Sequence, residues 1–318
     1  MQSKIVILGT GGTIAGTAAS ATDAIGYSAA QLGVAQLVAA VPALAQLPIE
    51  CEQVAQLDSK DMDFATWQRL AQRCAHHLAR ADVAGVVVTH GTDTLEETAY
   101  FLHRVLAPAK PLVLTAAMRP ATSLQADGPQ NLLDAVTLAC DGRVVGVSVV
   151  IAGRAWAGAE LRKRHTYRLD AFDAGDAGPL VVIEDGQVRA LRTQPRAGDP
   201  IGLEAIGKDA SHWPRVEIVL NHVGADGVLV DALIARQVDG LVAAGTGNGK
   251  LSAALEAALH RAVRAGVRVL RASRCANGPV LGGDIAELPG AAALSAVQAR
   301  VELLLQLLAA ASVRNASQ

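Results

Sequence analysis

Short runs of apolar, often β-branched residues alternate along this chain with longer stretches in which apolar residues recur three and four positions apart. The short runs are apolar at almost every position, which is typical of strands covered on both faces. They span residues 4–8, 83–89, 112–115, 144–151, 180–183, 216–220, 240–243 and 267–272. The longer stretches have the period of amphipathic helices and span residues 64–78, 94–106, 131–139, 229–234 and 251–263. The alternation predicts an α/β fold of mostly parallel sheets flanked by helices, with ligands at the carboxyl ends of the strands.

A chain of 318 residues is long enough for about two domains. Around residues 189–214, Arg, Pro, Gly, Asp and Ser cluster and the strand and helix periods disappear, which indicates a linker. We therefore expect a larger N-terminal α/β catalytic domain at residues 1–190, a linker at 191–212 and a smaller C-terminal α/β domain at 213–318.

Charge and cysteine content exclude several classes of function. The 28 Lys and Arg residues nearly balance the 30 Asp and Glu residues, without the basic stripe of a nucleic-acid-binding protein. Glycines interrupt the first apolar run too early for a secretory signal, and the apolar stretch at 303–313 is shorter than the roughly 20 residues that cross a bilayer. The four cysteines lie far apart, without the spacing of a disulfide framework or a metal site. We expect a cytoplasmic protein with no membrane segment.

The first motif with chemical potential is a glycine-rich turn at residues 8–16, directly after a buried-type strand. It lacks the dinucleotide-binding fingerprint, because Ile14 stands where the third glycine would be. Glycines allow the backbone to approach a ligand closely, and the hydroxyl of Thr10 or Thr13 could act as a nucleophile or ligand donor. A purely structural turn remains an equal alternative.

The second motif, residues 88–97, joins a strand to a helix. Thr94 and Glu97 have the spacing of a capping box. Thr92 and Asp93 come just before that cap, where their polar groups would face the strand-end crevice. His90 is more often structural in such a position. Lys163 belongs to a basic run at 160–165 that is normally solvated, but it would be a candidate base if it reached Thr92.

A third glycine-rich turn, residues 244–251, superficially resembles a phosphate-binding loop. Ala244 and Leu251 occupy two of its defining positions, so the motif is absent. The turn instead leaves Asn248 available for hydrogen bonding.

Together these segments resemble the bacterial-type L-asparaginase family, which includes asparaginase-glutaminases. The resemblance covers nearly the whole chain and rests on TGGTIAG at 10–16, LDSKDM at 57–62, THGTDTLEETAYF at 89–101, AMRPATSLQADGPQNL at 117–132 and GTGNG at 245–249. It implies a two-domain homotetramer, without cofactor or metal, that hydrolyses the side-chain amide of L-asparagine to L-aspartate and ammonia. L-Glutamine is a second candidate substrate, because one methylene changes binding by only about 1–3 kcal/mol.

The resemblance also implies roles for individual residues. The implied catalytic residues are Thr13, Tyr27, Thr92, Asp93 and Lys163. Thr13 corresponds to the primary nucleophile and Tyr27 to the tyrosine of a mobile loop that closes over it; Thr92 and Lys163 correspond to the second threonine and its lysine, with Asp93 orienting them. The implied substrate-binding residues are Gly12, Ser59, Lys60, Gly91, Thr92, Asp93 and Asn248. Ser59 would bind the substrate carboxylate, Asp93 its ammonium, and Asn248 would come from a neighbouring subunit. The main-chain amides of Gly12 and Thr92 are candidate oxyanion donors.

Two positions depart from the family pattern. Lys60 stands where periplasmic members usually have Gln, and its charge would repel the substrate ammonium. A Glu of the C-terminal domain has no clear equivalent, and Asp284 is the only candidate substitute. These departures leave open a turnover-impaired amino-acid-binding or sensory protein on the same fold, or a different small amide as substrate. An ammonia-supplying amidotransferase subunit is disfavoured because no basic surface for tRNA is evident.

Overall fold

The computed structural model describes residues 3–23, 25–195, 198–282 and 288–316. By its internal contacts the chain divides into two compact units, Met1–Leu203 and Glu204–Gln318. The division falls within the segment 191–212 that was predicted to be a linker.

The N-terminal unit is built on an eight-stranded sheet with the order β10-β9-β6-β5-β4-β3-β1-β2. The strands are β1 (Lys4–Gly11), β2 (Ile49–Leu57), β3 (Val83–Thr89), β4 (Pro111–Thr115), β5 (Gly146–Ile151), β6 (Arg154–Ala157), β9 (Val181–Glu184) and β10 (Gln187–Ala190). The first five strands pair in parallel, and β6, β9 and β10 extend the sheet with antiparallel pairings. A separate antiparallel pair joins β7 (Arg162–Lys163) to β8 (Phe172–Asp173). The predicted α/β class is confirmed.

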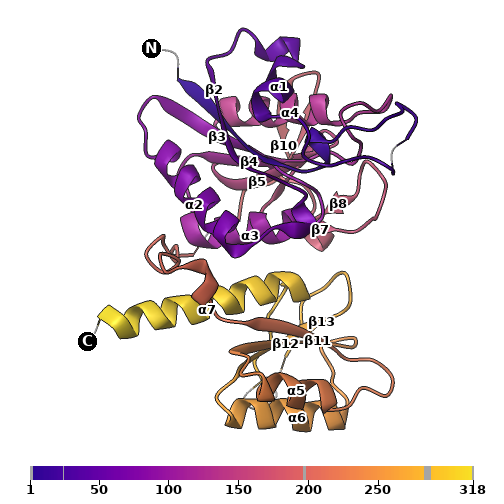
Figure 1. Cartoon of the computed structure of the whole chain (residues 1–318), viewed down its shortest axis with the longest axis vertical. Helices are drawn as coiled ribbons and strands as arrows, with labels where there is room; N and C mark the ends of the chain where they lie inside the picture. Colours follow the sequence, from indigo (N-terminus) through magenta and orange to yellow (C-terminus); the bar gives the residue numbers. More distant parts are fainter. Residues whose placement is uncertain (1–2, 24, 196–197, 283–287, 317–318) are drawn as a thin grey trace. The chain divides into compact units, whose positions relative to one another are not determined.

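Helices cover both faces of this sheet (Figure 1). Helices α1 (Val34–Ala39) and α4 (Gly128–Asp141) enclose one apolar core, while α2 (Phe64–Leu78) and α3 (Leu95–Leu106) pack on the opposite face. Trp67 of α2 stacks on Phe101 of α3 with ring centroids 4.7 Å apart. Cover on both faces explains why β1, β3 and β4 consist almost entirely of buried residues.

The strand register places the ends of β1 and β3 side by side. Gly9 of β1 is opposite Thr89 of β3, and Thr89 is in turn opposite Thr115 of β4. Parallel strands have their carboxyl ends at the same edge of a sheet, where side chains from consecutive loops meet. The segments after β1 and β3, which contain Thr13 and Thr92, are therefore brought together at this edge.

The C-terminal unit contains a parallel sheet of three strands, β11 (Val216–Leu220), β12 (Gly240–Gly245) and β13 (Arg268–Ser273). Helices α5 (Val228–Ala235) and α6 (Ala253–Arg264) lie on one side of this sheet and α7 (Ala296–Ala316) lies on the other (Figure 1). Leu241, Leu255 and Leu259 are completely buried in its core.

Helix α7 corrects one of the arguments made from the sequence. It has 21 residues, and the window Ala296–Arg314 is long and apolar enough to cross a membrane, so the apolar segment is longer than the stretch 303–313 that the sequence indicates. In the structure its buried side chains, among them Leu304, Leu305 and Leu308, pack against all three strands of the sheet. A helix that covers a sheet meets the same length and composition criteria, so the finding is weak support for a membrane span.

Candidate active site

Thr13 lies directly after β1, where a short 3-10 turn (Thr13–Ala15) follows Gly12. The Thr13 Oγ1 and Tyr27 Oη atoms are 2.7 Å apart, and Thr13 is buried. Tyr27 belongs to the loop between residues 17 and 28, whose ends pair through the Thr17–Ser28 bridge. Thr13 and Tyr27 are therefore in hydrogen-bond contact. The resemblance assigned them to one step, with Thr13 as the nucleophile and Tyr27 on the loop that closes over it.

A second group forms after β3. Lys163 Nζ lies 3.0 Å from Thr92 Oγ1 and 2.6 Å from Asp93 Oδ1. Thr92 is buried and the Lys163 side chain is 18% exposed, whereas the Asp93 side chain is 53% exposed and faces solvent. Lys163 therefore reaches Thr92 across 71 positions of sequence, as its proposed role as a base requires. Among the described residues, the second carboxylate oxygen of Asp93 has no hydrogen-bond donor, so it is open to a ligand.

Ser59 links the loop after β2 to the same group. Its Oγ accepts a hydrogen bond from the Asp93 main-chain amide at 3.1 Å, and the residue is 1% exposed. A hydroxyl has one O–H donor in addition to its acceptor lone pairs, so Ser59 can still donate while its oxygen accepts this hydrogen bond. Among the described residues it has no acceptor, so a ligand carboxylate can fill that role.

The backbones of Gly12 and Gly91 touch where the two groups meet. A Cβ on Gly12 would lie 2.3 Å from the Gly91 Cα, and Gly12 has a φ of 81°, a conformation that favours glycine. The Gly12 amide donates to the Leu57 carbonyl at 2.9 Å, and its role as an oxyanion donor stays a prediction. Within the described chain the Thr92 amide has no acceptor and remains a candidate donor.

The predicted capping box at Thr94 does not form. Thr94 is the N-cap residue of α3, but its side chain makes no capping hydrogen bond. Its hydroxyl instead donates to the Ser59 carbonyl at 2.8 Å. The tertiary contact has replaced the local one, and it ties the start of α3 to the loop that carries Ser59.

His90 lies behind the site and is completely buried, in agreement with its interpretation as structural. Burial lowers its pKa to about 4, so the ring is neutral. Its Nδ1 faces the Gly91 carbonyl at 2.7 Å, which can only accept, so Nδ1 carries the proton. Nε2 then accepts from the Thr98 hydroxyl at 3.0 Å, and Thr98 accepts from Trp67 Nε1 at 2.9 Å. This chain of bonds fixes the carbonyl of Gly91.

Lys60 does not carry an uncompensated charge toward the site. Its ammonium forms ion pairs with Asp61 and, at 3.8 Å, with Asp58, and its side chain is 61% exposed. The hydrogen bond to Asp61 is the main cause that raises the pKa of Lys60. Two carboxylates balance the cation, so the repulsion of a substrate ammonium expected from the sequence is offset.

Glu96 is a residue that sequence reasoning missed. Its Oε2 accepts a hydrogen bond from the main-chain amide of Lys163 at 3.1 Å. Burial raises the pKa of Glu96 to about 7. No sequence pattern connects it to Lys163, because the two residues are 67 positions apart and the contact depends on how β7 lies against α3.

Asn248 lies in the C-terminal unit, at the turn that follows β12. Its side-chain amide donates to the Leu281 carbonyl at 2.7 Å, and its Oδ1 accepts from the Leu281 amide at 2.6 Å. These two bonds hold the turn within its own unit, and the side chain is exposed. Asp284, the candidate substitute for the family glutamate, lies outside the described residues.

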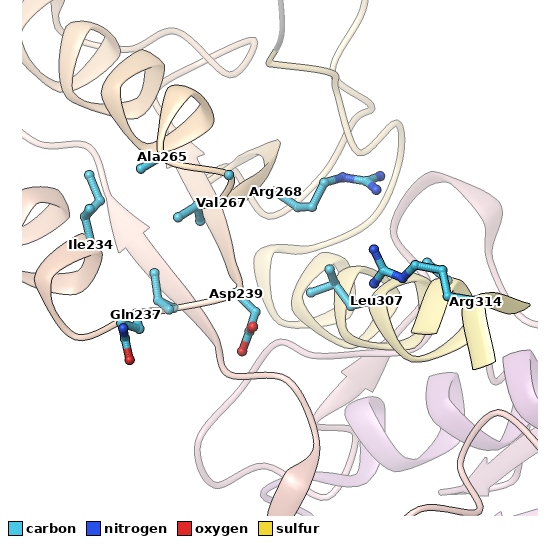
Figure 2. Close-up of a pocket in the computed structure, with 11 residues that line it drawn as sticks. Ile234, Gln237, Asp239, Ala265, Val267, Arg268, Leu307 and Arg314 are labelled. Carbon is cyan, nitrogen blue, oxygen red and sulfur yellow. The ribbon is translucent and has the colours of Figure 1, made fainter. Parts of the chain in front are cut away.

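A cavity of about 440 Å³ lies in the C-terminal unit, where β12 and β13 begin beside α7 (Figure 2). Gln237, Asp239, Arg268 and Arg314 line it together with apolar residues such as Leu307. None of the predicted site residues belongs to it. Within the described parts of the chain, no group of three or more His, Cys, Asp or Glu side chains is suited to a metal ion.

Comparison with known proteins identifies the family. A family model described as "Asparaginase, N-terminal" matches residues 4–196, and one described as "Glutaminase/Asparaginase C-terminal domain" matches residues 215–316. The chain belongs to the asparaginase family. The resemblance inferred from the motifs is confirmed.

Several curated members of the asparaginase family are similar over most of their length. L-asparaginase 2 of Escherichia coli (strain K12) is 39% identical over 281 residues, covering 86% of this chain and 79% of that protein. L-asparaginase 2 of Bacillus subtilis (strain 168) is 37% identical over 315 residues, covering 96% and 82%. A glutaminase-asparaginase of Pseudomonas fluorescens biotype A is 37% identical over 274 residues, covering 85% and 75%.

Among solved structures, a probable cytoplasmic L-asparaginase from Campylobacter jejuni superposes with a TM-score of 0.90 at 36% identity. The match covers 96% of this chain and 95% of that one. The asparaginase fold therefore extends over both units.

Proposed function

We propose that this protein is an L-asparaginase, an amidohydrolase that converts the side-chain amide of L-asparagine to L-aspartate and ammonia. The observation that carries the proposal is a pair of threonine hydroxyls. Thr13 and Thr92 each follow a glycine, and the backbones of these two glycines touch. The Thr13 hydroxyl contacts Tyr27, and the Thr92 hydroxyl contacts Lys163. Membership of the asparaginase family over both units supports the same chemistry.

In the first half-reaction the Thr13 Oγ1 attacks the carboxamide carbon. An unassisted hydroxyl is a weak nucleophile, so its proton must leave as the bond forms. Tyr27 Oη, 2.7 Å away, takes that proton and gives its own to the nitrogen, so that the carbon–nitrogen bond breaks and ammonia leaves. The Thr92 amide donates to the developing oxyanion, an interaction typically worth about 100- to 1000-fold in rate.

In the second half-reaction water attacks the threonyl ester and the bond to Thr13 breaks. The Thr92 hydroxyl, 3.0 Å from Lys163 Nζ, takes the water proton as its own proton passes on to the pair formed by Lys163 and Asp93. Tyr27 gives its proton to the departing Thr13 oxygen and takes one back from the acid product, so that L-aspartate leaves as the carboxylate, and the proton from water passes on to solvent. Asp93, 2.6 Å from Nζ, keeps the amine directed at this point.

Ser59 and Asp93 bind the amino-acid end of the substrate in this proposal. The Ser59 hydroxyl donates to the substrate carboxylate, while the hydrogen bond that its oxygen accepts from the Asp93 amide holds it in place. The open carboxylate oxygen of Asp93 accepts from the substrate ammonium. Gly12 and Gly91 contribute by shape, since any side chain there would fill the space between the two loops.

Ammonia release by the purified protein tests this function. We expect turnover of L-asparagine that is lost in Thr13→Ala and Thr92→Val, while exposed Thr166→Ala, a matched loss of one hydroxyl, retains it. Full turnover in either site variant would contradict the assigned role. Tight binding of L-asparagine or L-aspartate by the wild type without ammonia release would favour the binding or sensory alternative. Parallel assays with L-glutamine measure the second amide activity.

A homotetramer and a cytoplasmic location complete the proposal. Helix α5 is almost entirely apolar, yet among its residues only Val230 is fully buried, and Leu220, Val223, Val228 and Leu229 are exposed. Such a surface favours self-association, which light scattering coupled to size exclusion measures directly.

A relative named as cytoplasmic supports the location, while one from Haemophilus influenzae is named as periplasmic. Cell fractionation distinguishes the two.

A further inference from the structure

Lys163 depends on a very short element for its position. Strand β7 comprises Arg162 and Lys163, and within the described part of the chain its one pairing partner is the two-residue β8. The lysine side chain is a flexible four-carbon stem, so two hydrogen bonds from its Nζ do not by themselves fix the main chain that carries it. The next residue is held through its main chain, since the Arg164 amide donates to the Ala171 carbonyl at 2.8 Å. A separate contact reaches the main chain of Lys163 itself.

Glu96 makes that contact. It is the second residue of α3, three positions after Asp93 and four after Thr92, and it is partly buried. Its Oε2 accepts from the Lys163 main-chain amide at 3.1 Å. One carboxylate therefore joins the start of α3 to β7. The segments on either side of this bond carry all three members of the group formed by Thr92, Asp93 and Lys163.

We propose that Glu96 is a positioning residue for the amidase reaction, holding the main chain of Lys163 against α3 so that the amine stays at Thr92. The proposal rests on the proposed function for its catalytic consequence. Its structural part, the bond between Glu96 and the Lys163 amide, can be measured without any turnover. Glu96 itself contacts neither Thr13 nor Thr92 in the described contacts.

The charge state of Glu96 gives this role a pH signature. Burial raises its pKa to about 7, while the Lys163 amide and the cations Arg162 and Lys163 lower it and neighbouring Glu97 raises it. An ionised carboxylate is the stronger acceptor for an amide proton. The bond therefore strengthens as the pH rises through about 7, and the contribution of Glu96 to turnover rises with it.

The kinetic test compares three variants of the full-length protein. We expect Glu96→Ala to lower kcat by about 10- to 100-fold, as small misplacements of catalytic groups do, with a much smaller change in KM. Glu96→Gln keeps a carbonyl acceptor, so it should recover most of the kcat lost in Glu96→Ala but lose the rise near pH 7. Glu97→Gln, the matched control in the same helical turn, should keep that rise at a slightly lower pH, because it removes a neighbouring negative charge.

The structural test uses protein labelled with 15N-lysine, in which the Lys163 amide signal is assigned by its loss in Lys163→Arg. That signal should shift with a midpoint near pH 7 in the wild type and in Glu97→Gln, and should not shift there in Glu96→Gln. Unchanged kcat in Glu96→Ala, or a Lys163 amide that is insensitive to Glu96, would overturn the proposal. Absence of ammonia release from the wild type would overturn the proposed function alone, since the amide titration is still observed.

Discussion

The contact between Gly12 and Gly91 sets how close the two threonines can lie. The Gly12 amide donates to Leu57, and its carbonyl accepts from the amides of Ala15 and Ala30, so this residue is held by the turn, the loop and β2 at once. With its backbone fixed in this way, Gly12 cannot move aside to admit a side chain. Thr13 follows Gly12 and Thr92 follows Gly91, so this contact determines how the two threonines lie relative to each other.

We therefore expect Gly12→Ala to abolish turnover. The new Cβ would meet Gly91 Cα at 2.3 Å, and the alanine would have to adopt a φ of 81°. Gly142→Ala is the matched control, because Gly142 has a φ of 71° and a Cβ added there would meet no atom within 4 Å. That control should cost about 1–2 kcal/mol of unfolding free energy and leave kcat unchanged. Chemical denaturation and ammonia release measure both; wild-type kcat in Gly12→Ala would contradict the argument.

Some residues of the site could be predicted from the sequence, and others could not. Thr92 and Asp93 follow a buried strand, and the rule that ligands bind at carboxyl strand ends is enough to nominate them. Tyr27 and Ser59 came only from family resemblance, because no local pattern marks them. Glu96 was missed for a physical reason: its partner is a main-chain amide of a distant two-residue strand, which no sequence period reveals.

At the scale of elements, the loop that carries Tyr27 is held by a neighbouring loop after β4. The Ala121 amide donates to the Gly16 carbonyl at 2.9 Å, and the Leu124 amide donates to the Ala21 carbonyl at 3.0 Å. The Thr122 hydroxyl accepts from the Ala18 amide at 2.8 Å. These contacts give the motif at residues 117–132 a role as support for the loop between residues 17 and 28.

Replacing Thr122 by Val should loosen this loop without harming the core. The change keeps the shape of the side chain but leaves the Ala18 amide without its acceptor. A hydrogen bond of this kind contributes about 0.5–1.5 kcal/mol. We expect a several-fold loss in kcat/KM and faster proteolysis within residues 17–28, with little change in Tm. Ser123→Ala is the control, since the Ser123 hydroxyl accepts from Gln125 in its own turn; an equal effect of both changes would refute the support role.

The elements themselves differ in how well the sequence predicted them. Helix α2 matches its predicted bounds, because Asp63 caps it and its apolar period is strong. Strand β2 was missed because it lies at the sheet edge and carries Glu50 and Glu52, which pair with Arg80 and Arg73 of the α2 region. A strand with one polar side lacks the continuous apolar run that marked the central strands.

For the molecule as a whole, two buried titratable groups near the site affect stability in opposite directions. Burial lowers the pKa of His90 from 6.5 to about 4, so the unfolded chain binds a proton that the folded chain does not, and stability is lost as the pH falls from 6.5 toward 4. Burial raises the pKa of Glu96 from 4.5 to about 7, so stability is lost as the pH rises from 4.5 through 7. Each shift corresponds to about 3 kcal/mol.

Between pH 4.5 and 6.5 the two pH dependences oppose each other in the wild type, and single variants should separate them. We expect Glu96→Gln to have the same unfolding free energy as the wild type at pH 4.5 and one about 2–3 kcal/mol higher above pH 7. The difference grows because only the wild type must ionise a buried carboxyl as the pH rises. The loss of unfolding free energy caused by His90→Gln should be greatest above pH 6.5 and should shrink toward pH 4. At low pH the unfolded wild type gains a proton on His90 that the folded wild type cannot bind, so the wild type itself becomes less stable. Urea unfolding at about pH 4.5, 6 and 8 measures these differences, and values that stay constant with pH would show that neither group titrates as its burial requires.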